Sequence, residues 1–279
     1  MTSLRSLEVL AEGIGFTEGP LFTSDRRLLV VAMSRGLVVD VDLERGGVRG
    51  IVETGGGPNG LAEADDGSVW VAQNAGAVRA SRSPRPTRPG LQRLTGNDRQ
   101  DVLDLPVPGT RAPNDLLIGP DGRVWFTDPG PPGDTARGRL LALDPSTGEC
   151  EVLLDEQDFP NGLAFGPATG TLWLAHTERR RISRHHWDGG RLHPAGDDLT
   201  LPGGGPDGLA LDSRGLLYAA SPAADAVLVY APTGELHERL DFGEPTFPTN
   251  VCLAGEHQDR LVITAARGGR VLMLPAIAG

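Results

Sequence analysis

The sequence contains few cysteines, and they are poorly placed for a covalent or metal framework. Its 279 residues include two, Cys150 and Cys252, which lie far apart and lack the spacing of a zinc motif. A scaffold held together by several disulfides is therefore excluded. We expect both cysteines to be buried free thiols.

The sequence also lacks long hydrophobic runs. Arg5, Glu8 and Glu12 interrupt the N-terminal region, so it has no apolar stretch of signal-peptide length. No other segment approaches the roughly 20 apolar residues that a membrane-spanning helix needs. These features predict a soluble, cytoplasmic protein with no membrane partner.

Positive charge is scarce as well. The 26 basic residues are outnumbered by 37 acidic residues, which gives a formal net charge of −11. A surface of this sign repels polyanions, so we expect no nucleic-acid partner. The charge is compatible with a cation-binding cavity without indicating one by itself.

Three common catalytic motifs are missing. The glycine run Gly55-Gly56-Gly57 is not followed by the Lys-Ser/Thr pair of a phosphate-binding loop. There is neither a Gly-x-Ser-x-Gly nucleophile elbow nor a His-Glu-x-x-His zinc motif. Phosphate-loop, serine-hydrolase and zincin mechanisms therefore have no support.

The sequence does contain a short phrase that repeats with variations. In each copy a Pro-Asn-Gly-Leu-Ala type turn is followed by an Asp-Gly type turn and an aromatic strand. The clear copies begin at Pro58, Pro113, Pro160 and Pro206, and weaker ones lie at Glu18 and Pro248. The equivalent points, Glu18, Asn59, Asn114, Asn161, Asp207 and Thr249, are 41 to 55 residues apart. Such a period, with several short strands per unit, is typical of a β-propeller.

We therefore predict an all-β fold: a single six-bladed β-propeller domain of residues 1–279 with four strands in each blade. Glycine and proline supply 62 residues (39 + 23), and no stretch has a sustained helical period. The C-terminal strand at 270–274 lacks an outer partner, and an N-terminal strand at 6–10 is expected to close the ring. In the fourth blade we expect strands at 171–176, 181–187 and 192–199.

The repeat also predicts a site, because the innermost strands of a propeller begin close to its axis. Residues with oxygen ligands stand there in several blades: Glu18, Asn114, Asn161 and Asp207, with Asn59 and Asp115 as additional candidates. Carboxylate and amide oxygens form a hard ligand set that suits Ca²⁺ better than Zn²⁺ or copper. A structural alternative stays open, because Asn or Asp before Gly is also a common turn sequence.

Five phrases of the sequence carry a resemblance to a known family. They are Phe16-Thr17-Glu18-Gly19-Pro20, Arg111-Ala112-Pro113-Asn114-Asp115, Trp125-Phe126-Thr127-Asp128-Pro129-Gly130, Phe159-Pro160-Asn161-Gly162-Leu163 and Gly205-Pro206-Asp207-Gly208-Leu209. In this order and spacing they resemble the senescence marker protein / gluconolactonase / luciferin-regenerating enzyme family. The resemblance runs from about residue 8 to residue 274.

The resemblance implies a six-bladed propeller with one divalent cation and lactone hydrolysis as its commonest activity. The cation is usually Ca²⁺, with Zn²⁺, Mg²⁺ or Mn²⁺ as alternatives. By residue matching, Glu18, Asn161 and Asp207 would bind it, and Asn114 would bind it or contact the substrate. Asp207 would be the general base while the cation polarises the lactone carbonyl. A carboxylate bound to Ca²⁺ has a lowered pKa and is therefore a weak base. Whether Asp207 accepts the proton from water or a water bound to the cation is the nucleophile thus stays open.

Further residues are predicted to contact the substrate: Asn59, Arg111, Asn114, Asp115, Asp128 and His176. Sugar-lactone members of the family often have an arginine two residues before the Asn114 position. That position is Ala112 here, with Arg111 displaced by one residue. His176 stands where relatives commonly have an acidic residue, and it is either a channel-lining group that titrates near neutrality or a packed strand residue.

The segment 79–93 is unlike the rest of the chain. It contains five arginines and three prolines but no acidic residue. It is either a solvated, extended hairpin tip or a lid across the channel mouth that attracts an anionic substrate. Residues 129–138 form a second candidate lid.

The sequence thus predicts a Ca²⁺-dependent lactonase that acts on a small lactone or ester, as a monomer or weak dimer. One alternative keeps the fold and the metal but acts as an esterase, an organophosphatase or a natural-product pathway enzyme. Another is a non-catalytic propeller that binds a protein or peptide on its face. Metal affinity distinguishes the last, because such a scaffold does not need converging carboxylates.

Overall fold

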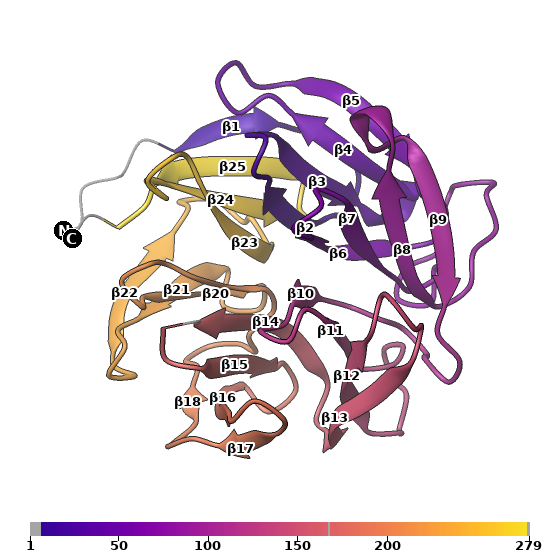
Figure 1. Ribbon diagram of the computed structural model, residues 1–279. Coiled ribbons are helices and arrows are strands. Elements are labelled where there is room, and N and C mark those ends of the chain that lie inside the picture. The colour runs from indigo at the N-terminus through magenta and orange to yellow at the C-terminus, as the bar shows by residue number, and fades with distance from the viewer. Residues whose placement is uncertain (1–6, 167, 278–279) are drawn as a thin grey trace.

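The computed structural model describes residues 7–166 and 168–277, whose strands form six antiparallel sheets around a central axis (Figure 1). Each sheet is a blade of four strand positions, counted from the axis outward. The predicted six-bladed β-propeller is confirmed. Two short 3₁₀ turns, η1 (Met33–Arg35) and η2 (Asn97–Arg99), lie between strands.

The first three blades follow one another in chain order. Blade one contains β2 (Thr17–Phe22), β3 (Leu28–Ala32), β4 (Leu37–Val41) and β5 (Val48–Glu53). Blade two contains β6 (Pro58–Glu63), β7 (Val69–Gln73), β8 (Gly90–Thr95) and β9 (Asp101–Pro106). Blade three contains β10 (Leu116–Ile118), β11 (Val124–Asp128), β12 (Gly138–Leu143) and β13 (Cys150–Gln157).

The last three blades repeat the pattern. Blade four contains β14 (Pro160–Gly166), β15 (Thr171–His176) and β16 (Arg181–Trp187), with β17 (Leu192–Pro194) and β18 (Leu199–Thr200) both paired to β16. Blade five contains β19 (Leu209–Leu211), β20 (Leu217–Ser221), β21 (Ala226–Tyr230) and β22 (Leu236–Asp241). Blade six contains β23 (Pro248–Ala254), β24 (Arg260–Ala265), β25 (Arg270–Pro275) and β1 (Glu8–Ala11).

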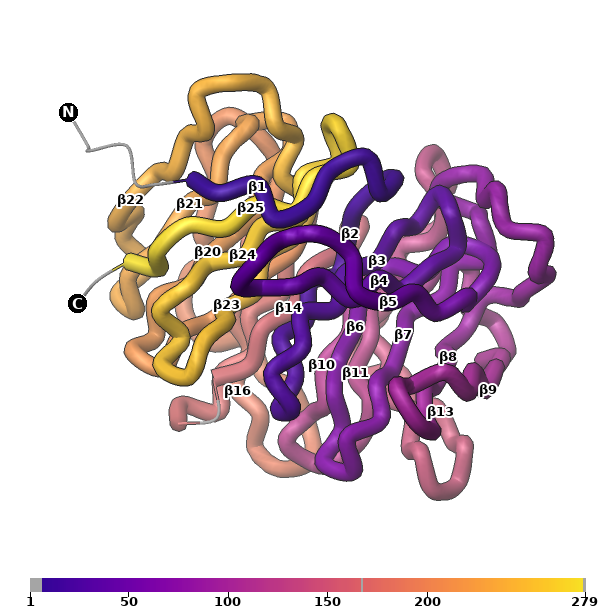
Figure 2. The backbone as a smooth tube through the Cα atoms, turned by 90° about the horizontal axis from the view of Figure 1, so that it is seen from above, coloured from indigo at the N-terminus to yellow at the C-terminus, as the bar shows by residue number. Residues whose placement is uncertain are grey.

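The ring is closed by the N-terminal strand. β1 pairs antiparallel with β25, with Glu8 opposite Met273 and Val9 opposite Leu272, and the two run side by side in Figure 2. The predicted closure is confirmed, although residue 6 of the expected strand lies outside the described residues. In blade four the strands expected at 171–176 and 181–187 are also confirmed, whereas the outermost one is divided between β17 and β18.

The core lies in layers between neighbouring blades. Successive residues of a strand face opposite sides of its sheet, so Trp125 packs against blade four while Phe126 packs against blade two. Both side chains are fully buried. The aromatic strand of the repeated phrase therefore joins each blade to its two neighbours.

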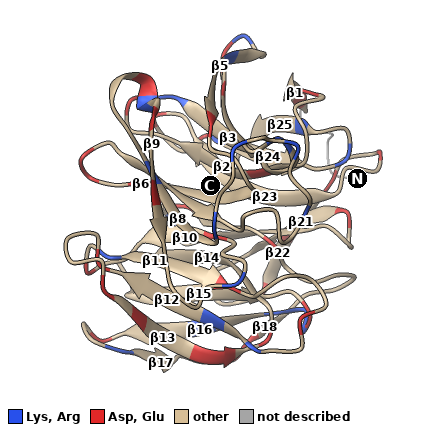
Figure 3. Cartoon of the chain, turned by 90° about the vertical axis from the view of Figure 1, so that its right-hand side faces the viewer, with Lys and Arg blue, Asp and Glu red and all other residues tan. Residues whose placement is uncertain are grey.

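Charged residues lie mainly on the loops and outer strands, and β13 at the rim carries several acidic residues (Figure 3). In the described part of the chain, no helix is long and apolar enough to cross a membrane. Both cysteines are free thiols, but the prediction that they are buried is wrong for Cys150, which is exposed because it begins the outermost strand β13. Cys252 on β23 is partly buried.

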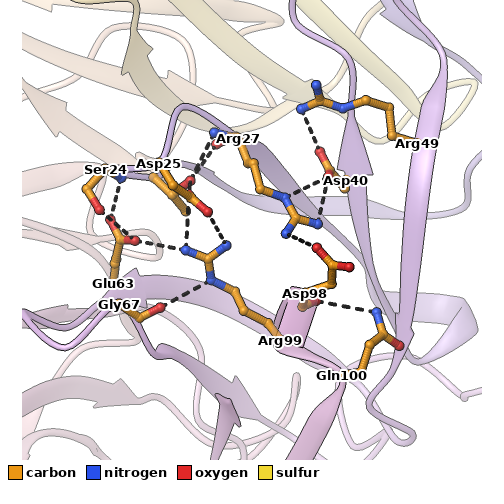
Figure 4. Close-up of polar contacts among 11 residues, drawn as sticks. Ser24, Asp25, Arg27, Asp40, Arg49, Glu63, Gly67, Asp98, Arg99 and Gln100 are labelled. Carbon is orange, nitrogen blue, oxygen red and sulfur yellow. Dashed lines mark hydrogen bonds and ion pairs between the residues drawn. The ribbon is translucent and has the colours of Figure 1, made fainter. Parts of the chain in front are cut away.

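An ion network joins blades one and two on the face opposite the starts of the innermost strands (Figure 4). Arg99 is 8% exposed, and its guanidinium donates to Asp25 at 3.0 and 3.1 Å and to Glu63 at 3.0 Å. Glu63 also accepts a hydrogen bond from the backbone N–H of Ser24 at 2.6 Å. These contacts hold Asp98 and Arg99 in the left-handed region, with φ of 53° and 57°.

Candidate functional site

The innermost strands begin on one face of the ring, which we call the site face. There their pairing with the second strand breaks register, between Pro58 and Leu61 in β6 and between Pro160 and Leu163 in β14. Such a bulge turns a side chain out of the regular alternation of the sheet. The breaks contain Asn59 and Asn161, two of the predicted site residues.

The glycines that follow these residues allow adjacent blades to approach closely. None of Gly60, Gly162 and Gly208 has a positive φ, so the Asn-Gly and Asp-Gly pairs are not left-handed turns. A Cβ at Gly162 would lie well inside 3.0 Å of the carbonyl oxygen of Asp207, and one at Gly208 would overlap the side chain of Asn250. The phrase is therefore explained by packing at the axis.

Backbone hydrogen bonds connect the blade starts around the ring. The N–H of Gly60 donates to the carbonyl of Asn114 at 2.8 Å, and the N–H of Gly162 donates to that of Asp207 at 3.1 Å. The N–H of Gly208 donates to the carbonyl of Thr249 at 2.9 Å. The positions of the site residues are thus fixed by main-chain contacts as well as by their own strands.

Carboxylates and amides alternate around the axis. Blades one, three and five contribute the carboxylates Glu18, Asp115 and Asp207, and blades two, four and six contribute the amides Asn59, Asn161 and Asn250. Asn114 adds a further amide from blade three, next to Asp115. Glu18, Asn59, Asn161 and Asp207 share one position of the repeated phrase with Asn114, whereas Asp115 and Asn250 occupy the next position.

Asn250 is a site residue that the sequence analysis missed. It follows Thr249, so the Thr249-Asn250 pair corresponds to Asn114-Asp115 in blade three. This correspondence between the two pairs was the sequence signal from which Asn250 could have been predicted. Asn250 donates to the Asp115 carboxylate at 3.1 Å, and because blades three and six are opposite one another, this bond crosses the axis. Its amide is also hydrogen-bonded to Glu18.

The amide of Asn161 is held in a defined orientation. Its Nδ2 donates to the hydroxyl of Thr177 at 3.2 Å, and that hydroxyl donates to the carbonyl of Pro206 at 2.7 Å. The same side chain is hydrogen-bonded to the carboxylate of Asp207. With its N–H groups engaged in these contacts, the carbonyl oxygen Oδ1 stays available to a ligand.

Burial raises the pKa of all three carboxyl groups, and repulsion by neighbouring carboxylates raises the pKa of Glu18 and Asp207 further. Burial, with Asp115 nearby, raises the pKa of Asp207 to about 8, and burial raises that of Asp115 to about 6. Burial raises the pKa of Glu18 well above its usual value, and Asp207 and Asp115 raise it further. Asp207 nevertheless keeps a partly exposed side chain, whereas Glu18 and Asp115 are buried.

These residues fit a divalent cation. Within residues 7–166 and 168–277 no Arg or His forms an ion pair with any of the three carboxylates, and burying an unpaired carboxylate is unfavourable. The described residues contain no group of three or more His, Cys, Asp or Glu close enough to hold a metal. A cation here would therefore need amide oxygens among its ligands, as Ca²⁺ commonly has.

Two predicted substrate contacts, Arg111 and Asp128, hold loops of the site face. The Arg111 guanidinium forms an ion pair with Asp134 and donates to the carbonyl of Arg137 at 2.7 Å. Asp128 is fully buried and accepts bonds from the N–H of Arg111 and from Arg139 at 2.9 Å. The candidate lid at 129–138 is therefore fastened by Arg111, and the structure does not bring either residue into contact with the axial carboxylates.

His176 also lies apart from the axial carboxylates. Its Nε2 is hydrogen-bonded to the hydroxyl of Ser183 at 2.8 Å, and Ser183 is in turn 2.9 Å from Nε2 of His185. Burial lowers the pKa of His176 to about 4, so the ring is neutral near pH 7. These contacts fit the packed alternative for His176 within blade four.

The all-β ring of six blades, with carboxylate and amide side chains at its axis, defines the structural class as a six-bladed β-propeller with a polar axial site. The family described as the SMP-30/Gluconolactonase/LRE-like region matches residues 16–267, and the chain belongs to it. A gluconolactonase of Zymomonas mobilis is 26% identical over 93% of this chain and 79% of its own length. A pentonolactonase of Haloferax volcanii is 29% identical over 90% of this chain and 81% of its own.

Solved structures show the same arrangement. A gluconolactonase of Xanthomonas campestris superposes with a TM-score of 0.79 at 26% identity, covering 96% of this chain and 89% of its own. A calcium-binding protein, regucalcin, of Agrobacterium tumefaciens superposes with a TM-score of 0.78 at 19% identity, covering 97% and 93%. The latter likeness concerns the fold alone.

Proposed function

We propose that the protein is a lactone hydrolase whose site is the ring of carboxylates and amides at the axis. The observation that carries the proposal is a set of three carboxylates, two buried and one partly exposed, without a basic partner in the described residues, at the start of the innermost strands. Relatives named gluconolactonase and pentonolactonase support the reaction class. A small cyclic ester is the expected substrate.

The site would hold one divalent cation, with Ca²⁺ favoured by the ligand chemistry. Glu18, Asn161 and Asp207 would bind it, and Asn114 would bind it or contact the substrate. When bound, the cation would polarise the ester carbonyl and stabilise negative charge on its oxygen. The side-chain amides of Asn59 and Asn114 have no hydrogen-bond partner among the described residues, which supports their assignment as ligand or substrate contacts.

The side chains of the chain have distinct tasks in this proposal. Asp207 is partly exposed and would accept a proton from the attacking water. Asn161 donates to the Asp207 carboxylate, which favours its ionised form and fixes its orientation. Asn250 bonds to both Glu18 and Asp115 and would keep the opposite side of the ring in place.

The test is acid release from a panel of sugar, aliphatic and aromatic lactones by chelator-treated protein, before and after addition of Ca²⁺. We expect turnover only with the cation, and at least a hundredfold loss in Asp207→Ala, in line with the loss of a general base. Asp101→Asn, on the exposed outer strand β9, is the matched control and should behave as wild type.

Each other outcome has a defined meaning. Full activity after chelation would contradict the cation's role, and near-normal activity of Asp207→Ala would contradict the role of that residue. Hydrolysis of aryl esters or organophosphates but of no lactone would favour the alternative enzyme. Silence with every substrate, despite cation binding, would reject the hydrolase.

A further inference from the structure

The connection between β7 and β8 is unusually long for this ring. It contains 16 residues, from Asn74 to Pro89, whereas the corresponding connections of blades one, four, five and six contain four each. Gln73, the last residue of β7, pairs with Pro58 at the start of β6. The connection therefore lies on the site face, beside Asn59.

The connection is packed against blade one. The N–H of Arg82 donates to the carbonyl of Ser34 at 3.0 Å. The Arg85 guanidinium bonds to the carbonyl of Thr54 and forms an ion pair with Asp104 at 2.8 Å. Gly55 is required beneath it, because a Cβ there would lie within 3.0 Å of the Arg85 carbonyl. These contacts anchor the segment against blade one, while alternate residues from Arg82 to Arg88 stay exposed to solvent.

Three arginines of the connection have uncompensated charge. In the described part of the chain Arg79, Arg82 and Arg88 form no ion pair, and all three are exposed. Three other arginines of the site face are neutralised, Arg111 by Asp134, Arg137 by Asp158, and Arg270 by Glu244, whereas Arg35, Arg180 and Arg267 have no ion pair among the described residues. The region around Arg79 and Arg82 is therefore positive in a protein whose formal net charge is −11.

Arg79 is held close to the axial site. Its guanidinium carbon lies 4.3 Å from the centre of the Phe16 ring, a cation–π contact that leaves the edges of the guanidinium open to a ligand. The N–H of Phe16 donates to the Ser34 hydroxyl at 3.1 Å, which fixes that ring's backbone. Phe16 precedes Glu18 by two residues, a separation of about 7 Å along an extended chain.

The acidic groups at the axis give the position of Arg79 a role in binding an anionic substrate. Three carboxyl groups lie at the axis, which makes it an unfavourable place for an anionic group of a substrate, whereas the exposed guanidinium groups of the connection can bind such a group. We propose that Arg79 and Arg82 form a subsite for an anionic group, and that the preferred substrates are lactones bearing a carboxylate, sulfonate or phosphate away from the ester. This inference rests on the proposed lactonase function for its reaction, but the binding it predicts is measurable separately.

The experiment compares two lactones that differ at one carbon. D-Glucono-1,4-lactone has a neutral CH₂OH group at C6, and D-glucaro-1,4-lactone has a carboxylate there. We measure kcat/KM for both with the Ca²⁺-loaded protein, and binding of both by calorimetry. We expect wild type to favour the anionic lactone, and Arg79→Ala/Arg82→Ala to lower the anionic-to-neutral ratio roughly tenfold, since charge-assisted hydrogen bonds are lost.

Two further variants separate charge from shape. Arg79→Lys/Arg82→Lys keeps the charges and should retain part of the preference, and 1 M salt should weaken the preference of wild type. Arg45→Ala removes one positive charge from an exposed turn of the opposite face and should keep the wild-type ratio. Because Arg79 and Arg82 are exposed, the variants should melt within a few degrees of wild type.

The outcomes distinguish this inference from the lactonase proposal. An unchanged ratio in the alanine variant, or a wild-type preference for the neutral lactone, overturns the anionic subsite and leaves the hydrolase intact. If neither lactone is hydrolysed, selective binding of the anionic lactone that the alanine variant loses supports the subsite while the hydrolase fails. Equal binding of the two lactones, or none, rejects the subsite.

Discussion

Replacing Asp207 by asparagine should stabilise the metal-free protein near pH 8, although it removes a proposed cation ligand. The carboxylate of Asp207 sits close to Asp115 with no basic partner in the described residues. Its charge therefore opposes folding unless a cation is bound. Asparagine keeps the shape of the side chain and removes that charge.

The size of the effect follows from the pKa. The pKa of Asp207 rises from its ordinary 3.8 to about 8 in the folded protein. Below pH 3.8 both folded and unfolded states hold the proton and the effect vanishes. As the pH rises towards 8, only the unfolded state loses it, so stability falls and the loss is complete above the folded pKa. Four units correspond to about 5 kcal/mol.

A smaller net gain is expected from the substitution itself. Asparagine weakens the charge-assisted hydrogen bond from Asn161, which is worth about 1–2 kcal/mol. Asp115 and Glu18 remain and still repel one another, so part of the unfavourable charge persists. We therefore expect the free energy of unfolding of Asp207→Asn to exceed that of wild type by about 3 kcal/mol at pH 8 and by nearly nothing at pH 4.

The assay is urea unfolding at pH 4, 6 and 8, in chelator and in Ca²⁺. Ca²⁺ should raise the stability of wild type, by about 2.7 kcal/mol at a hundred times its dissociation constant, and should have little effect on Asp207→Asn. Asp128→Asn is the matched control. Asp128 is fully buried and is paired with Arg139, so its substitution should destabilise the protein at pH 8.

One result refutes the reasoning directly. If Asp207→Asn is less stable than wild type in chelator at pH 8, the charge of the Asp207 carboxylate is already compensated in the metal-free protein. The axial site would then not require a cation for its stability. A Ca²⁺ response of equal size in both proteins would place the binding of the ion elsewhere.

The remaining predictions concern packing. Gly162→Ala should destabilise the protein by about 2–4 kcal/mol and weaken Ca²⁺ binding, because its Cβ would meet the backbone of Asp207. Urea unfolding and calorimetric titration with Ca²⁺ test this. The control Gly190→Ala, in an open turn, should be nearly neutral. Arg99→Ala should lower the free energy of unfolding by about 2–3 kcal/mol, measured in urea, because the largely buried Glu63 loses its basic partner. Arg26→Ala, whose ion pair is exposed, should change it by less than about 0.5 kcal/mol, and an equal effect of the two would contradict the ion network.

The fold could be predicted because a propeller repeats one local solution. Each blade must solve the same packing problem, so the phrase around Trp70, Trp125 and Trp173 recurs and its period counts the blades. The closing strand β1 was predictable for a related reason, since a three-stranded last blade leaves an open edge. The repeated local phrase was therefore sufficient to predict the six-bladed ring and its closure.

The site residues could be predicted only where their shared position in the repeat determines that their side chains point to the axis. Glu18, Asn161 and Asp207 share one position of the repeated phrase, and the ring brings that position to the axis. Arg111 and Asp128 lie close to that phrase in sequence, but their side chains hold loops, and nothing in the residue order shows this. Asn250 was missed because the repeat is weak in blade six and one residue of register changes which side chain reaches the axis.

The glycines of the phrase show why site and fold cannot be separated in this protein. Gly60, Gly162 and Gly208 let neighbouring innermost strands come close enough for their main chains to bond. That approach also buries carboxylates from alternate blades near one another, and burial followed by repulsion raises the pKa values of Glu18 and Asp207. Binding of the proposed cation should therefore stabilise the inner ring most, whereas the ion network at Arg99 should be unaffected.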